Sequence, residues 1–196
     1  MISHDEVVHL KKSMLEKMPG EPEDKFRNLK AAYTFMFCHP GKKLLFMGQE
    51  FGQLREWSEE RELDWFLLGE EKHCDLKDFV QALLKMYRKY PALYAMDTDP
   101  SGFEWINADD GDRSIYSFVR KSPTGRNNLL VVCNFTPVDR PDYRVGVPKK
   151  KQYTLVLDEN GQTEKKEFKA EASECDNRPF SFAYPLPGYG VAVFKY

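Results

Sequence analysis

The sequence changes character at Pro91, and this change limits which folds the chain can adopt. Before Pro91, residues 23–38 and 75–90 carry apolar side chains at three- and four-residue spacing, which predicts two amphipathic helices. An apolar run at residues 43–47 lies between them and is typical of a strand that is buried on both faces. The long polar loop at residues 48–68 separates this strand from the second helix and is a candidate functional loop. This order of elements predicts βα units.

The part of the chain after Pro91 consists of short β-rich runs that are separated by turn residues. The runs lie at residues 103–107, 114–120, 128–134, 143–147, 153–158, 168–172, 180–184 and 190–196. Their spacing predicts an antiparallel β-sandwich of about seven or eight strands, with Trp105 and Phe135 in its core. We therefore expect an α+β chain with two domains, residues 1–95 and residues 96–196.

Two imidazoles and two carboxylates lie within residues 3–9 (Ser-His-Asp-Glu-Val-Val-His), and three interpretations are open. A zinc-binding helix needs two histidines four positions apart, whereas His4 and His9 are five apart and no cysteine pair is near. The segment could instead be a solvated start of the chain, capped by Ser3 or Asp5. In the third interpretation, a carboxylate beside an imidazole stabilises the oxocarbenium-like transition state of a glycosidase-type reaction.

Several motifs occur in a fixed order along the chain. They are Ile-Ser-His-Asp-Glu-Val-Val-His at residues 2–9, Gly-Gln-Glu-Phe at 48–51, Arg-Glu-Trp at 55–57, Leu-Asp-Trp at 63–65, Gly-Phe-Glu-Trp-Ile at 102–106 and Asn-Phe-Thr-Pro at 134–137. The set resembles the 1,4-α-glucan (glycogen) branching enzymes of the α-amylase superfamily, over most of the chain. The sequence departs from that family at Leu10, where glycine is common, and at Gln49, where asparagine is more usual.

The resemblance implies a fold and a reaction. Members of the family carry a (β/α)8 catalytic barrel followed by a C-terminal β-domain, so residues 1–5 and 43–47 would be barrel strands seven and eight. The chain would then hold the last two βα units of an incomplete barrel. The implied reaction cleaves an α-1,4 link with retention of configuration and transfers the chain to a 6-hydroxyl, which forms an α-1,6 branch. Asp5 matches the carboxylate that stabilises the transition state, and His4 matches the histidine that contacts substrate hydroxyls.

The family's nucleophile and its acid/base come from strands four and five, which would precede residue 1. We therefore expect this chain alone to be inactive. Glu50 would line the sugar cleft or pair with a basic residue such as Arg55, and Trp57 would stack on a glucose ring or cover the barrel rim. His9 is expected to contribute to the substrate site by positioning its loop, and Trp65 is expected in the core.

Composition excludes some partners and leaves others open. A formal net charge of -2 gives no basis for binding nucleic acid or an anionic membrane. The four scattered cysteines and the lack of a signal peptide or long apolar run predict a cytoplasmic protein. We expect no metal and no cofactor. The expected substrate of the parent enzyme is an α-1,4-glucan (amylose or glycogen), and the exposed edge of the strand at residues 43–47 predicts self-association. The alternatives are a fragment of another α-glucan hydrolase and a non-catalytic β-sandwich that binds glucan or a partner.

Overall fold

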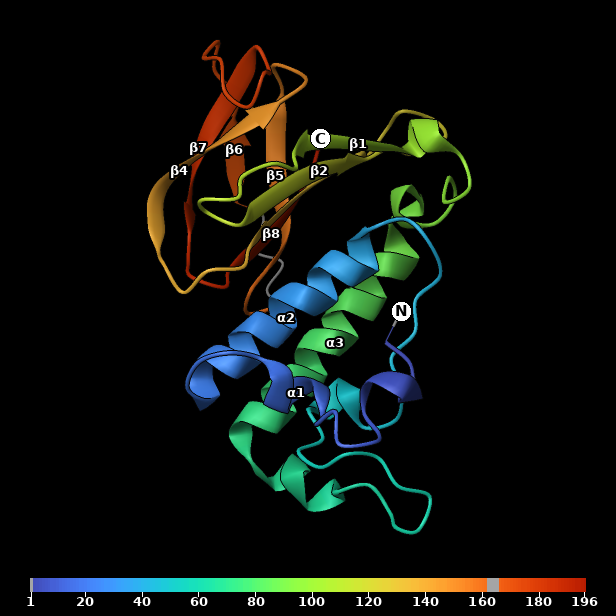
Figure 1. The fold of residues 1–196 in the computed structure, drawn as a ribbon. Helices are drawn as coiled ribbons and strands as arrows, with labels where there is room; N and C mark the ends of the chain where they lie inside the picture. Colours follow the sequence, from blue (N-terminus) through green and yellow to red (C-terminus); the bar gives the residue numbers. More distant parts are fainter. Residues whose placement is uncertain (1, 162–165) are drawn as a thin grey trace.

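The structure, a computed structural model, describes residues 2–161 and 166–196, and it combines a helical part with a β-rich part (Figure 1). The helices are α1 (Met14–Lys17), α2 (Pro22–Cys38) and α3 (Glu71–Lys89). The helices expected at residues 23–38 and 75–90 are confirmed, although α3 begins four residues earlier than its pattern indicated. None of the helices in the described ranges is long and apolar enough to cross a membrane.

Local chemistry explains where α2 begins and ends. Pro22 occupies the first turn, where its missing N–H costs nothing, and Glu23 and Asp24 follow at the positive end of the helix dipole. The helix ends at Cys38 because the next residue, His39, precedes a proline and takes an extended conformation. The first turn of α3 includes His73, which is buried and has its Nδ1 2.7 Å from the carbonyl oxygen of Phe51.

Eight antiparallel strands in the described ranges form two sheets, which confirms the expected sandwich. The strands are β1 (Phe103–Asn107), β2 (Ile115–Arg120), β3 (Leu129–Asn134), β4 (Arg140–Val147), β5 (Gln152–Asp158), β6 (Glu167–Lys169), β7 (Phe180–Leu186) and β8 (Val191–Lys195). The larger sheet has the order β1-β2-β3-β8-β5-β6, and the smaller sheet is the pair β4-β7.

The larger sheet is buried on both faces, because helices cover one face and the smaller sheet covers the other. Leu129, Val131 and Cys133 of β3 belong to the core shared with α2 and α3. The alternate residues Leu130 and Val132 belong to the core shared with β4 and β7. Alternate residues of β3 thus face opposite sides of the larger sheet. The fold has three layers, which are the helices, the larger sheet and the smaller sheet, and α2 and α3 run side by side beneath the larger sheet (Figure 1).

The expected strand at residues 43–47 is wrong for this chain. Only one parallel bridge forms there among the described residues, between Leu45 and Ile2, and Ile2 donates its N–H to the carbonyl oxygen of Leu44 at 3.1 Å. A parallel strand needs a paired neighbour along its length, and the described chain offers it a single residue. As a result Leu44 and Met47 are exposed, at 40% and 50%.

Three aromatic residues lie elsewhere than expected. Trp105 is 37% exposed, and its ring packs against Phe35 of α2 and Phe118 of β2, between helix and sheet and not between the two sheets. Phe135 contacts the same Phe35 ring, at 5.9 Å between centroids. Trp65 is 52% exposed, with its ring 5.3 Å from that of Phe51, so its expected place in the core is wrong.

Candidate functional site

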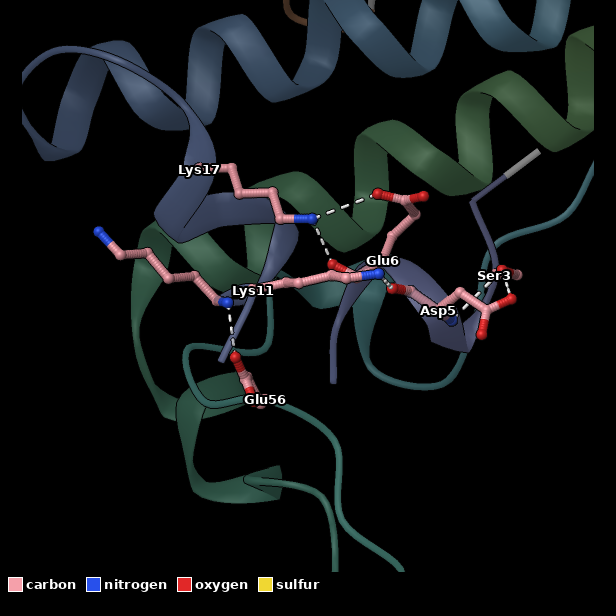
Figure 2. Close-up of polar contacts among 7 residues, drawn as sticks. Ser3, Asp5, Glu6, Lys11, Lys17 and Glu56 are labelled. Carbon is pink, nitrogen blue, oxygen red and sulfur yellow. Dashed lines mark hydrogen bonds and ion pairs between the residues drawn. The ribbon is translucent and has the colours of Figure 1, made fainter. Parts of the chain in front are cut away.

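His4 and Asp5 project from a one-turn 3₁₀ helix, His4–Glu6, near the start of the chain. Ser3 caps this turn, because its Oγ accepts the N–H of Asp5 at 3.3 Å. A cap by Ser3 was one of the interpretations of the sequence. The side chains of His4 and Asp5 are 58% and 68% exposed, and His4 Nε2 lies 3.2 Å from Asp5 Oδ1. Lys11 holds the backbone below, since its Nζ donates to the carbonyl oxygen of Asp5 at 2.8 Å (Figure 2). The imidazole and the carboxylate are thus adjacent and open to a ligand.

A chain of aromatic rings connects His4 to the loop at residues 48–68. The His4 ring lies 5.9 Å from Phe46, and the Phe46 ring meets Trp57 edge to face at 5.3 Å. Trp57 also donates its backbone N–H to the carbonyl oxygen of Val7 at 3.0 Å. Trp57 therefore lies beside the His4–Asp5 turn although it is about fifty residues away in sequence. Half-buried aromatic side chains beside polar groups suit the faces of sugar rings.

Glu50 lies in a second 3₁₀ turn, Gln49–Phe51, which follows Gly48 with its left-handed φ of 83°. Its suggested pairing with Arg55 is wrong, because Arg55 instead binds Asp64 through two guanidinium nitrogens, with its Nε at 2.8 Å. Burial above all, and also the Glu50 charge, raise the pKa of the Tyr33 hydroxyl. That hydroxyl anchors the turn from below by donating to the carbonyl oxygen of Gln49 at 2.9 Å.

The loop at residues 48–68 is held together by one buried carboxylate, that of Asp64, whose side chain is 4% exposed. Besides Arg55, Asp64 accepts the side-chain amide of Gln53 at 2.9 Å and returns its own backbone N–H to Gln53 Oε1 at 3.0 Å. A buried carboxylate with several donors fixes the side chains that surround it. The loop is therefore ordered by its own contacts, and this order places Glu50 and Trp57.

The segment after the His4–Asp5 turn has an unusual backbone. His9, Leu10 and Lys12 have φ values of 60°, 63° and 68°, which is the left-handed region that favours glycine. The conformation of Leu10 explains why a glycine at this position would fit, and the exposed Leu10 side chain gains nothing in return. The N–H groups of Leu10 and Lys12 both bind the carboxylate of Glu56, at 3.1 Å and 2.6 Å. The side chain of His9 makes no hydrogen bond or ion pair with the residues described.

The structure brings His4, Asp5 and Trp57 to one region, but the small cavity beside it is not lined by His4 or Asp5. This cavity of about 10 Å³ lies between residues 7–15 and the loop at residues 47–57. Of the expected site residues, Trp57 lines it. Gln49, one of its lining residues, is 3% exposed. Within the described ranges, no group of three or more His, Cys, Asp or Glu side chains is placed to hold a metal ion.

Sequence reasoning missed Gln53, Glu56 and Asp64 as organising residues. Glu56 and Asp64 stand inside motifs that were noted for their resemblance, Arg-Glu-Trp and Leu-Asp-Trp. Nothing in their spacing shows that Glu56 would bind N–H groups more than forty residues away. The sequence does show that Glu56 lies between Arg55 and Trp57 in a long loop. This position makes Glu56 a candidate functional residue but does not predict its partner.

Comparison with known proteins shows what the chain is similar to in sequence. Residues 105–196 match the family model described as alpha amylase, C-terminal all-beta domain. The chain is 54% identical, over all of its length, to the 1,4-alpha-glucan branching enzyme GlgB of Butyrivibrio fibrisolvens, and 44% identical to that of Aquifex aeolicus (strain VF5). The chain is related to the 1,4-alpha-glucan branching enzymes. It covers 32% of each of these two relatives, so it spans about a third of their length.

Solved structures agree on the fold. The chain aligns over 94% of its length with Ttha1563 from Thermus thermophilus, at a TM-score of 0.63 and 19% identity, and covers 33% of that chain. It aligns over 98% of its length with an alpha-amylase from H. orenii, at a TM-score of 0.58 and 17% identity, and covers 38% of that chain. The resemblance to branching enzymes is confirmed by the sequence comparison, and the fold is shared with these two solved structures.

Proposed function

We propose that the chain is the C-terminal part of a 1,4-α-glucan branching enzyme, which cleaves α-1,4 links in a glucan and transfers the released chain to a 6-hydroxyl. Similarity to branching enzymes along the whole chain is the observation that carries this proposal. The relatives are named for the branching reaction, and the fold shared with an alpha-amylase supports the proposal. The domain boundary belongs to the same proposal, with barrel residues at 1–95 and the β-sandwich at 96–196.

Within this enzyme, Asp5 is the carboxylate that stabilises the transition state and His4 contacts substrate hydroxyls. The exposure of both side chains and their 3.2 Å contact support these roles, because a ligand can reach them and the imidazole can orient the carboxylate. A carboxylate that binds sugar hydroxyls more strongly in the transition state than in the ground state lowers the barrier. Retaining enzymes also need a nucleophile and an acid/base about 5 Å apart, which the rest of the enzyme supplies.

Trp57, Glu50 and His9 complete the glucan site in this proposal. Trp57 offers a half-buried ring beside His4, and Glu50 lies half-exposed on its 3₁₀ turn. The chain alone is inactive, because it brings one of three required carboxylates. The free chain also self-associates through its exposed apolar side chains at Leu44 and Met47. The four free cysteines support a reducing compartment and hence a cytoplasmic location.

An amylose–iodine assay on two proteins tests the proposal. One is the free chain, and the other is a chimera in which this chain replaces the matching third of the Butyrivibrio fibrisolvens relative. We expect the chimera to reduce the blue colour and the free chain to leave it unchanged. Activity of the free chain would contradict the proposal, and the nucleophile and acid would then have to be among its own carboxylates, starting with Asp5, Glu6 and Glu50. An inactive but folded chimera would also contradict it.

A further inference from the structure

The carboxylate of Glu56 binds two backbone N–H groups of a segment far away in sequence. Its Oε2 accepts the N–H of Leu10 at 3.1 Å. Its Oε1 accepts the N–H of Lys12 at 2.6 Å, which is the dashed contact drawn at Glu56 in Figure 2. Residues 9–12 contain three left-handed φ values, and left-handed residues turn neighbouring N–H groups toward one side of the chain. The result is a concave backbone cradle that suits an anion, and the anion in this cradle is a side chain of the same protein.

This contact explains a conformation that the sequence of the segment does not favour. His9, Leu10 and Lys12 all carry a Cβ that disfavours the left-handed region. The Leu10 side chain is 95% exposed, so no packing of its own compensates. The two hydrogen bonds to Glu56 are charge-assisted, the stronger kind, and they join the segment to Glu56 in this conformation. Glu56 is therefore the group that selects it.

The cradle is connected to the proposed catalytic carboxylate on both sides. Lys11, which lies between the two bound N–H groups, donates its Nζ to the carbonyl oxygen of Asp5 at 2.8 Å. Trp57, the neighbour of Glu56, donates its N–H to the carbonyl oxygen of Val7 at 3.0 Å. Glu56 and Trp57 thus hold both ends of the segment that directly follows Asp5. Displacement of the cradle would release Lys11 and, with it, the Asp5 backbone.

We propose that Glu56 is a positioning residue for the glucan site, which fixes residues 9–12 and, through Lys11, the backbone of Asp5. The role assigned to Asp5 rests on the proposed function, whereas the fixing of the segment does not. Glu56 itself touches no reacting atom in this proposal. Its hydrogen bond to the Leu10 N–H stabilises the left-handed conformation that a glycine at position 10 would adopt without strain.

Amide NMR spectra of the ¹⁵N-labelled free chain test the proposal. Glu56→Gln keeps the shape of the side chain but presents an NH₂ group to one of the two N–H donors, and Glu56→Ala removes both acceptors. We expect the Leu10 and Lys12 amide protons to move upfield in both variants, and the Asp5 amide to shift with them. The matched control is Glu59→Gln, in the same loop, whose side chain makes no hydrogen bond or ion pair with the described residues. Resonances of the β-domain report that each variant is folded.

Two further measurements separate the steps. Lys11→Met should shift the Asp5 amide and should leave the hydrogen bonds of Leu10 and Lys12 to Glu56 formed, because it removes only the contact of Lys11 with the Asp5 carbonyl oxygen. Trypsin cleavage after Lys11 and Lys12 should accelerate on the order of tenfold in Glu56→Gln, the factor that loss of one charge-assisted hydrogen bond gives. Leu10 and Lys12 amides that are unchanged in Glu56→Gln, or changed equally in Glu59→Gln, would overturn the proposal. None of these readouts needs catalysis, so they stand apart from a failure of the branching assay.

Discussion

Arg120 of β2 is completely buried, and loss of its ion pair with Asp97 should destabilise this chain strongly. Its Nη2 lies 2.6 Å from Asp97 Oδ1, and its Nη1 donates to the carbonyl oxygen of Cys38 at 2.7 Å. The Nε has no hydrogen-bond partner in the described structure. The guanidinium thus ties three segments together: β2, the end of α2 and the connection that follows α3. Asp97→Ala would leave a buried cation with one carbonyl partner.

The expected cost of Asp97→Ala is about 3–5 kcal/mol, the range for breaking a buried ion pair by removal of one partner. Urea slopes for small proteins are roughly 1–3 kcal/mol per molar, so the unfolding midpoint should fall by about 1–5 M. Equilibrium urea unfolding, followed by tryptophan fluorescence, measures this shift. The double variant Asp97→Ala with Arg120→Met should recover part of the loss, because it removes the uncompensated charge.

Lys72→Ala serves as the control, since Lys72 pairs with Glu23 on the surface and both side chains are largely exposed. Its midpoint should stay unchanged. A fall of less than about 0.3 M for Asp97→Ala would refute the reasoning, because a buried guanidinium would then tolerate the loss of its counter-ion. A double variant no more stable than Asp97→Ala would contradict the assignment of the cost to the unpaired charge.

Three further predictions concern single sites. Leu10→Gly should stabilise the chain by about 0.5–1 kcal/mol in urea unfolding, because it removes the left-handed penalty at an exposed position, whereas Leu10→Ala should give no gain; equal effects would contradict this. Burial lowers the pKa of Lys43 to about 8 from the ordinary 10.5, so the unfolded chain binds more protons between these values and stability rises with pH there. Lys43→Met should therefore lose stability relative to the natural chain as pH rises from about 7 to about 10, and a pH-independent difference would count against it. Cys38 and Cys133 are fully buried, and burial raises the pKa of both thiols, so native-state alkylation at neutral pH followed by mass spectrometry should spare them; modification as fast as that of Cys74 would show otherwise.

The elements that sequence predicted well are those whose pattern is complete within the element. The helix at Pro22–Cys38 has its periodicity, its acidic first turn and its terminating His39-Pro40 in one stretch. The strands of the sandwich likewise carry alternation and turn residues locally, and β3 shows both faces buried as its run of apolar residues indicates. Such patterns report burial without naming the partner, and for these elements burial was enough to assign the type.

The errors arose where the partner decides the outcome. The run at residues 43–47 has the composition of a buried strand, yet it forms one bridge because Ile2 is the only neighbour in the described part of the chain that pairs with it. The pattern around Trp105 predicts a core position, and its actual contact with Phe35 depends on how α2 lies against the sheet. The role of Glu56 could not be predicted for the same reason. Its partners are backbone N–H groups, and the sequence of their segment has no pattern that predicts the left-handed conformation.

The most direct test of the central claim compares Asp5→Ala with Glu6→Ala in the chimera with the Butyrivibrio fibrisolvens relative. The two carboxylates are neighbours on the same exposed turn, and Glu6 pairs with Lys17 at its edge. Proton NMR of the product glucan resolves α-1,6 from α-1,4 anomeric signals and so counts branches. We expect Asp5→Ala to lower the rate of branch formation on the order of 100-fold, as loss of a transition-state contact does, and Glu6→Ala to change it by a few-fold at most. Equal rates for the two variants would contradict the assignment of Asp5 to the active site.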